Sequence, residues 1–130
     1  LTPAALADVR RGAAVYAAPA RYEPFGLGIL EAARDRCALV LGDIPSLREI
    51  WDDAAVYVAP DDDERLARTL EALLADPAAV ARLTERAARR AVRFTAPAMA
   101  SAYRRLYDEM SGARAPSHAA PPSRRERIVA

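Results

Sequence analysis

The segment that decides the fold reads Y-E-P-F-G-L-G-I-L-E-A-A and spans residues 22–33. Its two carboxylates, Glu23 and Glu31, stand eight positions apart. Pro24 is poorly suited to a helix interior, whereas Gly26 permits a tight backbone path, so we expect a helix to begin near Gly26. Glu23 then lies on the loop that enters the helix, and Glu31 lies about a turn and a half inside it. Both acids can face one cleft, with the free N–H groups of the helix start between them, which suits hydroxyls and an anion together.

Apolar runs on both sides of this segment predict buried parallel strands at residues 13–18, 38–41 and 55–59. Residues that favour helix starts predict the helices between and after them. Thr2 is a candidate N-cap for a first helix that ends near Gly12. Asp62 or Asp63 is a candidate N-cap for a helix that runs to about residue 75. Asp76 begins a helix that runs to about residue 94, and Thr95 begins the last one. The segment's own helix is expected to end near residue 36, and a short helix opens at residue 45.

Apolar residues at helical spacing predict the buried stripes of these helices. The first helix contributes Leu6 and Val9, and the helix after Asp62 contributes Leu66, Leu70, Leu73 and Leu74. The next has Val80, Leu83, Ala87 and Val92 as inner positions. The last helix contains Met99, Tyr103, Leu106 and Met110, with no buried stripe assigned.

Alternating strands and helices predict an α/β fold with right-handed crossovers and a three-stranded parallel sheet. Three strands are few for a doubly wound sheet, and the closing helices are many. We therefore expect a partial Rossmann-like domain at residues 1–110, with its first strands missing. Residues 111–130 are rich in Pro, Ser, Ala and Arg without apolar periodicity, which predicts a disordered tail.

Composition excludes several classes of function. The 130 residues suit one domain, and a net charge of +1 does not indicate a nucleic-acid binder. A single cysteine excludes an internal disulfide and a multi-cysteine zinc site, and the acidic run at 61–64 lacks the spacing of a calcium loop. The only histidine, His118, lies in the predicted tail. No apolar run is long enough to span a bilayer, and the cytoplasm is the expected compartment. Because the sequence begins with Leu1 and not with methionine, we expect a processed or a partial product.

Basic residues suggest one further surface. The arginines between residues 82 and 93 mark a basic face on one helix, for which a solvated surface is the default interpretation and contact with RNA or a membrane the alternative.

The segment with its flanks resembles a known family. It carries Glu, one residue, Phe-Gly-Leu, three residues and Glu-Ala; A-A-V-Y-A-A-P precedes it, and L-V-L-G-D-I-P-S-L-R-E-I and A-V-Y-V-A-P-D-D-D follow in order. This arrangement resembles the Glu-(seven residues)-Glu signature of retaining glycosyltransferases of the GT-B fold, especially family 4, over roughly residues 6–110. The resemblance implies the later part of the C-terminal, donor-binding domain.

The resemblance implies a role for each residue of the signature. Glu31 would bind the ribose hydroxyls of a nucleotide sugar, and Glu23, the one catalytic candidate, would contact hydroxyls of the transferred sugar. Gly26 and Leu27 would offer backbone N–H groups to sugar or phosphate oxygens, and Phe25 would line the pocket. Each has a simpler alternative: a solvated Glu31, a Glu23 that stabilises the helix start, a turn glycine, and core packing of Phe25.

The resemblance also implies what is missing. Such enzymes need no metal or other cofactor, and an Arg and a Lys from earlier in the domain stabilise the leaving diphosphate. This sequence contains no lysine and no such pair; Arg21 is a weak candidate substitute. We therefore expect a hexosyltransferase-like enzyme whose isolated chain is inactive. Its partners would be a nucleotide-sugar donor, an unknown acceptor and the N-terminal domain of the same protein, with peripheral membrane contact open. The alternative is a non-catalytic module that binds a nucleotide sugar or a protein.

Four positions depart from the family pattern. Ala20 stands where serine is frequent, Pro24 where glycine is commoner, and Ala38 where proline is usual. Arg36 replaces the glycine that usually ends the signature helix. A left-handed conformation at Arg36 would cost on the order of 1 kcal/mol.

Overall fold

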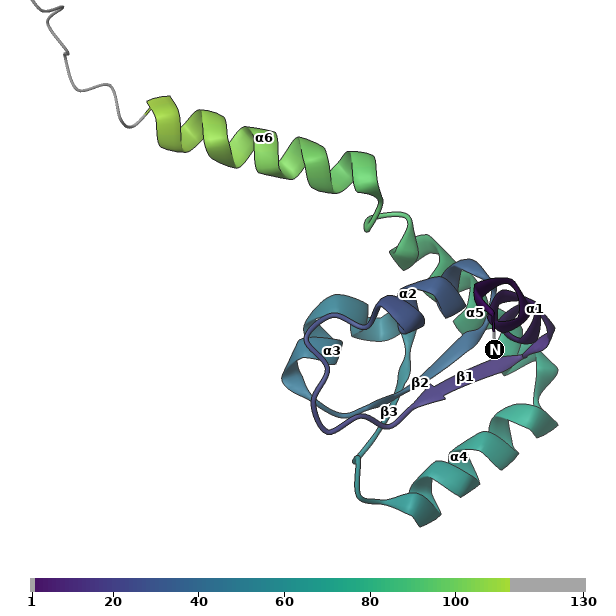
Figure 1. Cartoon of the computed structure of the whole chain (residues 1–130). Helices are drawn as coiled ribbons and strands as arrows, with labels where there is room; N and C mark the ends of the chain where they lie inside the picture. The colour runs from purple at the N-terminus through teal and green to yellow at the C-terminus, as the bar shows by residue number, and fades with distance from the viewer. Residues whose placement is uncertain (1, 113–130) are drawn as a thin grey trace, which may run out of the picture. The chain divides into compact units, whose positions relative to one another are not determined.

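The computed structural model describes residues 2–112 and contains a three-stranded parallel sheet with the order β1-β2-β3 (Figure 1). The strands are β1 (Val15–Ala18), β2 (Ala38–Gly42) and β3 (Val56–Val58). Both pairings are parallel, with Val15 opposite Ala38 and Val40 opposite Val56. The predicted α/β fold with a three-stranded parallel sheet is confirmed, and each strand differs from its predicted bounds by no more than two residues at either end.

The helices begin close to the predicted positions. They are α1 (Pro3–Gly12), α2 (Leu27–Arg34), α3 (Pro45–Trp51), a 3-10 turn η1 (Asp52–Ala54), α4 (Asp63–Ala75), α5 (Pro77–Ala91) and α6 (Ala96–Gly112). Three predicted caps are present, because the side chains of Thr2, Asp62 and Asp76 each accept a hydrogen bond from the backbone N–H three residues later. Two predicted ends were too late, since α2 stops at Arg34 and α5 at Ala91.

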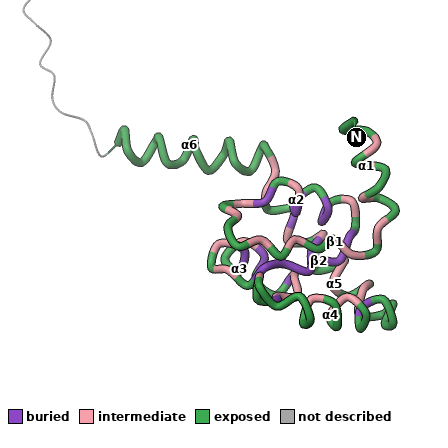
Figure 2. The backbone as a smooth tube through the Cα atoms, turned by 60° about the horizontal axis from the view of Figure 1, so that its bottom comes forward, coloured by how far each residue is buried: buried purple, intermediate pink, exposed green. Residues whose placement is uncertain are grey.

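The sheet has two faces with unequal cover. On the α2 face, Leu39 and Leu41 pack with α2, α3 and the end of α5. On the α4 face, Val40 packs with α4 and the first half of α5. Every residue of β2 is buried, as the tube in Figure 2 shows. Adjacent side chains of a strand point to opposite faces, so one apolar run supplies both cores.

Several predicted inner positions lie on the surface instead. Leu74 is 67% exposed and Val92 is 70% exposed, and Leu6 and Val9 are exposed as well. Leu74 stands about 100° around α4 from the buried Leu73, so both cannot face a sheet of three strands. Val92 follows the last residue of α5 and has left the stripe that ends with Ala91.

The turn from α2 into β2 contains a non-glycine residue in the left-handed region, the case that the sequence raised for Arg36. Arg36 has φ of 69°, in the left-handed region that glycine occupies freely. The Cys37 N–H donates to the carbonyl of Ala32, which closes the end of the helix over this turn. Arg36 reaches outward to Glu85 of α5, with its Nη1 at 2.9 Å from Oε2.

The chain divides into two compact units, residues 1–95 and 96–130, the second described only to residue 112. Its helix α6 has no buried residue, and it carries the exposed side chains Met99, Tyr103, Leu106, Tyr107 and Met110. The helix extends two residues beyond the predicted boundary at 110, while residues 113–130 of the predicted tail, with His118, lie outside the described residues. Within residues 2–112 no helix has the length and apolar character that crossing a membrane requires.

Candidate functional site

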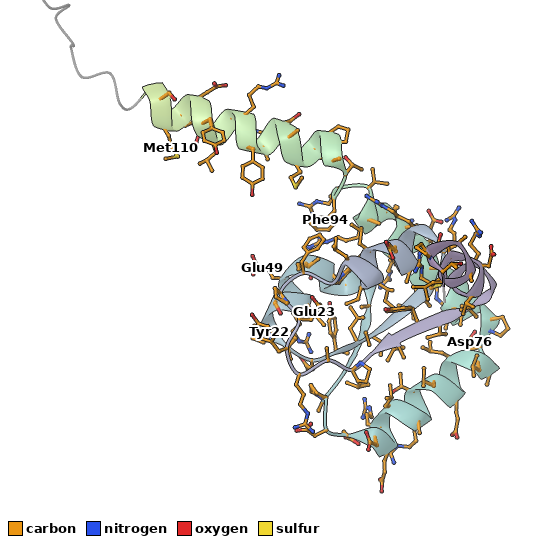
Figure 3. All side chains as sticks on the ribbon, in the orientation of Figure 1. Tyr22, Glu23, Glu49, Asp76, Phe94 and Met110 are labelled. Carbon is orange, nitrogen blue, oxygen red and sulfur yellow. The ribbon has the colours of Figure 1, made fainter. Side chains whose placement is uncertain are left out.

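The candidate site begins with the loop between β1 and α2, at the carboxyl end of the sheet. Loops after parallel strands meet at this edge, where α/β domains commonly bind ligands. Two contacts hold the loop to its neighbours: Ser46 Oγ of α3 donates to the carbonyl of Glu23 at 2.7 Å, and Arg21 pairs with Asp61 after β3, with Nη2 at 2.6 Å from Oδ1. Figure 3 shows Tyr22 and Glu23 at this end of the sheet and Asp76 toward the other. The predicted site loop therefore contacts helix α3, which follows β2, and the loop that follows β3.

The backbone of β2 also approaches the backbone of this loop closely, at Gly42 and Ala20. A Cβ atom added at Gly42, the last residue of β2, would lie 2.3 Å from the carbonyl oxygen of Ala20. No side chain fits at that distance, so glycine at position 42 lets β2 lie directly against the loop that leads to Glu23.

Glu23 bends back onto the start of α2. Its Oε1 accepts hydrogen bonds from the N–H groups of Phe25 at 3.3 Å and Gly26 at 2.8 Å. A carboxylate at this position satisfies donors that the helix leaves unpaired and interacts favourably with the positive end of its dipole. This is the contact that the simpler interpretation of Glu23 predicted. The other oxygen, Oε2, has no partner among residues 2–112.

Gly26 is the N-cap of α2, with φ of 80° and ψ of 68°. A Cβ there would lie 2.6 Å from Ile29 Cδ1, so both conformation and space require glycine. Its N–H is taken by Glu23 and is not free in this structure, contrary to the arrangement expected from the sequence. The N–H group of Leu27, by contrast, donates to no acceptor in the described part of the chain, and the Leu27 side chain is exposed. Leu27 therefore keeps the donor that an anion at the helix start would use.

Phe25 lies half-buried against the α2-face core. Its ring meets that of Phe94 in a T-shaped arrangement, with centroids 5.5 Å apart, and Phe94 in turn lies against Trp51. Such edge-to-face pairs favour a fixed position of the loop. The contacts agree with the packing role that the sequence left open for Phe25.

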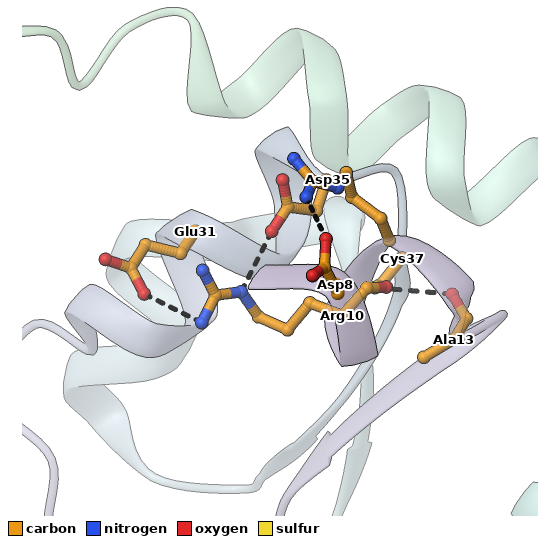
Figure 4. A network of polar contacts seen from close by, with 7 residues as sticks. Asp8, Arg10, Ala13, Glu31, Asp35 and Cys37 are labelled. Carbon is orange, nitrogen blue, oxygen red and sulfur yellow. Dashed lines mark hydrogen bonds and ion pairs between the residues drawn. The ribbon is translucent and has the colours of Figure 1, made fainter. Parts of the chain in front are cut away.

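Glu31 lies in the second turn of α2, and its contacts point toward α1. Its Oε2 is 3.1 Å from Nη1 of Arg10, and its side chain is 53% exposed. Arg10 also donates from Nε to Asp35 Oδ2 at 2.9 Å (Figure 4). The hydrogen bond to Asp35, followed by the charge of Glu31, raises the pKa of the Arg10 guanidinium despite its burial. The structure thus gives Glu23 and Glu31 separate contacts, one at the helix start and one beside α1.

Arg10 is the residue of this region that the sequence pattern did not indicate. It stands 21 positions before Glu31 and belongs to a different helix, so no spacing rule joins the two. Only the packing of α1 beside α2 brings them together.

A second charged group lies at the same edge of the sheet. Arg48 pairs with Asp43 after β2, and its guanidinium lies 4.4 Å from the centre of the Tyr57 ring. The hydrogen bond from Arg48 lowers the pKa of Asp43, and burial raises the pKa of Tyr57 to about 12. Tyr57 donates its hydroxyl to the carbonyl of Leu47 at 3.3 Å, so this group fastens α3 to β3. No cluster of three or more potential metal ligands occurs within residues 2–112.

Comparison with known proteins gives consistent similarities. The chain is 35% identical over 101 residues to a lipopolysaccharide core biosynthesis mannosyltransferase of Rhizobium leguminosarum bv. viciae, covering 75% of this chain and 29% of the relative. It is 34% identical over 90 residues to an alpha-maltose-1-phosphate synthase of Mycobacterium tuberculosis, covering 63% of this chain and 23% of that protein. The chain therefore spans less than a third of the length of these relatives.

A solved structure has the same architecture. Sucrose-phosphate synthase from Thermosynechococcus elongatus matches with a TM-score of 0.75 and 28% identity, over 85% of this chain and 28% of that one. The shared fold is that of GT-B glycosyltransferases. The sequence pattern of the family described as "Glycosyl transferases group 1" matches residues 2–90, which is well over half of the sequence. The chain therefore belongs to the group 1 glycosyl transferases.

Proposed function

We propose that the protein transfers a sugar from a nucleotide-sugar donor to an acceptor with retention of configuration, and that this chain holds part of the donor site. The observation that carries the proposal is the loop at the carboxyl edge, which joins Glu23 to the start of α2 with Glu31 one turn further on. The names of the relatives, a mannosyltransferase and two synthases of sugar phosphates, support a hexosyltransferase.

Each part of the loop has a chemical task in this proposal. The start of α2, with the unpaired N–H of Leu27, receives a phosphate oxygen of the donor. Glu23 uses Oε1 to hold the helix start and Oε2 to accept a hydroxyl of the transferred sugar, which combines the two roles that the sequence suggested. Glu31, half-exposed beside Arg10, accepts the ribose hydroxyls.

The rest of the active centre is proposed to come from outside this chain. The donor diphosphate needs positive charge when it leaves, and the described edge offers Arg21 only in an ion pair with Asp61. We therefore propose that other parts of the whole protein supply this charge and the acceptor site, without a metal, and that the isolated chain gives no turnover.

The test compares Glu31→Ala with a matched control in protein expressed from the complete reading frame. Glu71→Ala removes an exposed glutamate of α4 that has no described contact and serves as the control. UDP- and GDP-sugars are titrated calorimetrically. Loss of charged hydrogen bonds worth about 1.5–3 kcal/mol predicts roughly 10- to 100-fold weaker binding for Glu31→Ala and none for the control. Unchanged affinity in Glu31→Ala would remove Glu31 from the donor site.

Turnover separates the proposal from its alternative. The proposal expects the complete protein to release nucleotide and glycosylate an acceptor from a panel of sugars and sugar phosphates. The complete protein could instead bind the donor tightly and release no nucleotide, either with any acceptor or by hydrolysis of the donor. That result would favour a non-catalytic binding module.

A further inference from the structure

Arg10 lies between two acids on one face of α2. Glu31 and Asp35 are four positions apart, so their side chains are neighbours on the helix surface and repel each other when both are ionised. Arg10 enters from α1 and meets both, with Nη1 at 3.1 Å from Glu31 and Nε at 2.9 Å from Asp35 (Figure 4). One guanidinium therefore relieves the repulsion and sets the direction of both carboxylates.

The exposure of the Arg10 and Glu31 side chains separates an inner and an outer side of this group. The Arg10 side chain is 12% exposed, while that of Glu31 is 53% exposed. Within the described residues, Arg10 takes Oε2 of Glu31 and leaves Oε1 without a protein partner. The guanidinium thus forms the inner support of a carboxylate whose outer oxygen faces solvent.

The backbone carbonyl of Arg10 contacts the side chain of Cys37. Cys37 Sγ is 3.3 Å from the carbonyl oxygen of Arg10 and 3.4 Å from that of Ala13, within reach of a thiol hydrogen bond to either. Cys37 is fully buried at the entry to β2. The backbone at the end of α1 therefore contacts the buried residue that precedes the central strand, and the base of the Arg10 side chain lies against the core.

We propose that Arg10 is a positioning residue of the donor site, which holds the Glu31 carboxylate in the orientation that receives the ribose hydroxyls. This inference rests on the proposed function of Glu31. Each carboxylate oxygen can accept two hydrogen bonds, so the contact with Arg10 leaves capacity for both hydroxyls. Without Arg10, repulsion from Asp35 turns Glu31 toward solvent and the hydroxyls lose their oriented acceptor.

The experiment asks whether Arg10 governs recognition of the ribose hydroxyl. Protein from the complete reading frame is titrated with UDP, GDP and ADP, each beside its 2′-deoxy counterpart, and the tightest pair is used. The readout is the ratio of the two affinities. A residue that merely ties α1 to α2 lowers the melting temperature but leaves this ratio unchanged.

Four variants give the answer. Glu31→Ala and Arg10→Ala are each expected to bring the ratio from about tenfold toward one, and the double variant to add nothing further. Arg11→Ala, which removes a neighbouring exposed arginine of α1, is expected to keep the parental ratio. Arg10→Lys keeps the charge but not the fork that reaches both acids, so an intermediate ratio is expected.

The outcomes distinguish the two proposals. A ratio that falls in Glu31→Ala but persists in folded Arg10→Ala or Arg10→Lys overturns the role of Arg10 alone. A ratio that persists in Glu31→Ala, or the absence of binding by every nucleotide, overturns the ribose site and the inference with it. Should Arg10→Ala fail to fold, an unchanged ratio in Arg10→Lys would still contradict the inference. A reduced ratio in Asp35→Asn, which keeps the Arg10–Glu31 contact, would contradict it as well.

Discussion

The two faces of the sheet are built from the same three strands but carry very different cores. The α2 face has twelve buried residues in its cluster, among them Trp51, Leu39 and Leu47, whereas the cluster of the α4 face has three within the described chain: Val40, Val58 and Leu73. Helix α2 and the loop that precedes it pack on the thicker side. The difference suggests that the thick core positions the site, and that the α4 face mainly closes the sheet against water.

The largest expected effect comes from removing one leucine on each face. Leu39→Ala opens a cavity in a fully buried position of β2, where little can collapse, and should lower the free energy of unfolding by about 4 kcal/mol. Leu73→Ala, at the thinner α4 face, should cost about 2 kcal/mol because the surrounding helix can relax. Urea denaturation measures both. Equal losses would show that the two faces contribute alike, which would contradict the comparison.

The next effect tests whether strain at the end of β2 reaches the site loop. Gly42→Ala forces a methyl group against the carbonyl of Ala20, so β2 or the loop must shift, at a cost of about 1–3 kcal/mol. Gly12→Ala places its methyl group in open space and serves as the control, expected to be neutral or slightly stabilising. The unfolding free energy of each variant is measured, and donor affinity in the complete protein with it. Loss of stability with unchanged donor affinity would separate the loop from the site.

The sequence predicted the fold well because its signals are local. Apolar runs placed β1, β2 and β3, and the carboxylates and hydroxyl of Asp62, Asp76 and Thr2 marked helix starts through bonds that span three residues. Prediction failed for Leu74, because periodicity does not say how many residues a narrow sheet can cover.

The site was harder to predict than the fold. Glu23, Gly26 and Glu31 were proposed from their spacing around a helix start and from resemblance to a family pattern. The support of Glu31 by Arg10 was not, since it depends on how two helices pack. The bend of Glu23 back to Gly26 was recognised only as an alternative, because spacing alone does not fix a side chain's direction.

A smaller effect is expected at the turn that leads from α2 into β2. Arg36→Gly relieves a left-handed conformation and should raise the free energy of unfolding by about 1 kcal/mol. Arg36→Ala loses the same exposed ion pair to Glu85 but keeps the strained φ, so it is the matched control and should be neutral or slightly destabilising. The difference between the unfolding free energies of the two variants therefore measures the cost of the left-handed backbone conformation at position 36. Equal stabilities would mean that the turn relaxes without glycine.

The smallest effect at neutral pH, and the one with the clearest pH signature, concerns Tyr57 on the α2 face of the edge strand β3. Burial raises its pKa from 10.0 to about 12, so the folded state keeps the phenol proton while the unfolded chain releases it. The unfolded state therefore binds fewer protons above pH 10, and stability must fall as the pH rises from about 10 to about 12. Tyr57→Phe removes this titration at the cost of one weak hydrogen bond to Leu47, about 0.5–1 kcal/mol at pH 7. The variant should thus begin less stable than the parent protein and gain on it through that window. A stability difference that stays constant between pH 9 and pH 12 would mean that water reaches the phenol, and that the α2 face is open at β3 rather than closed by Arg48 and α3.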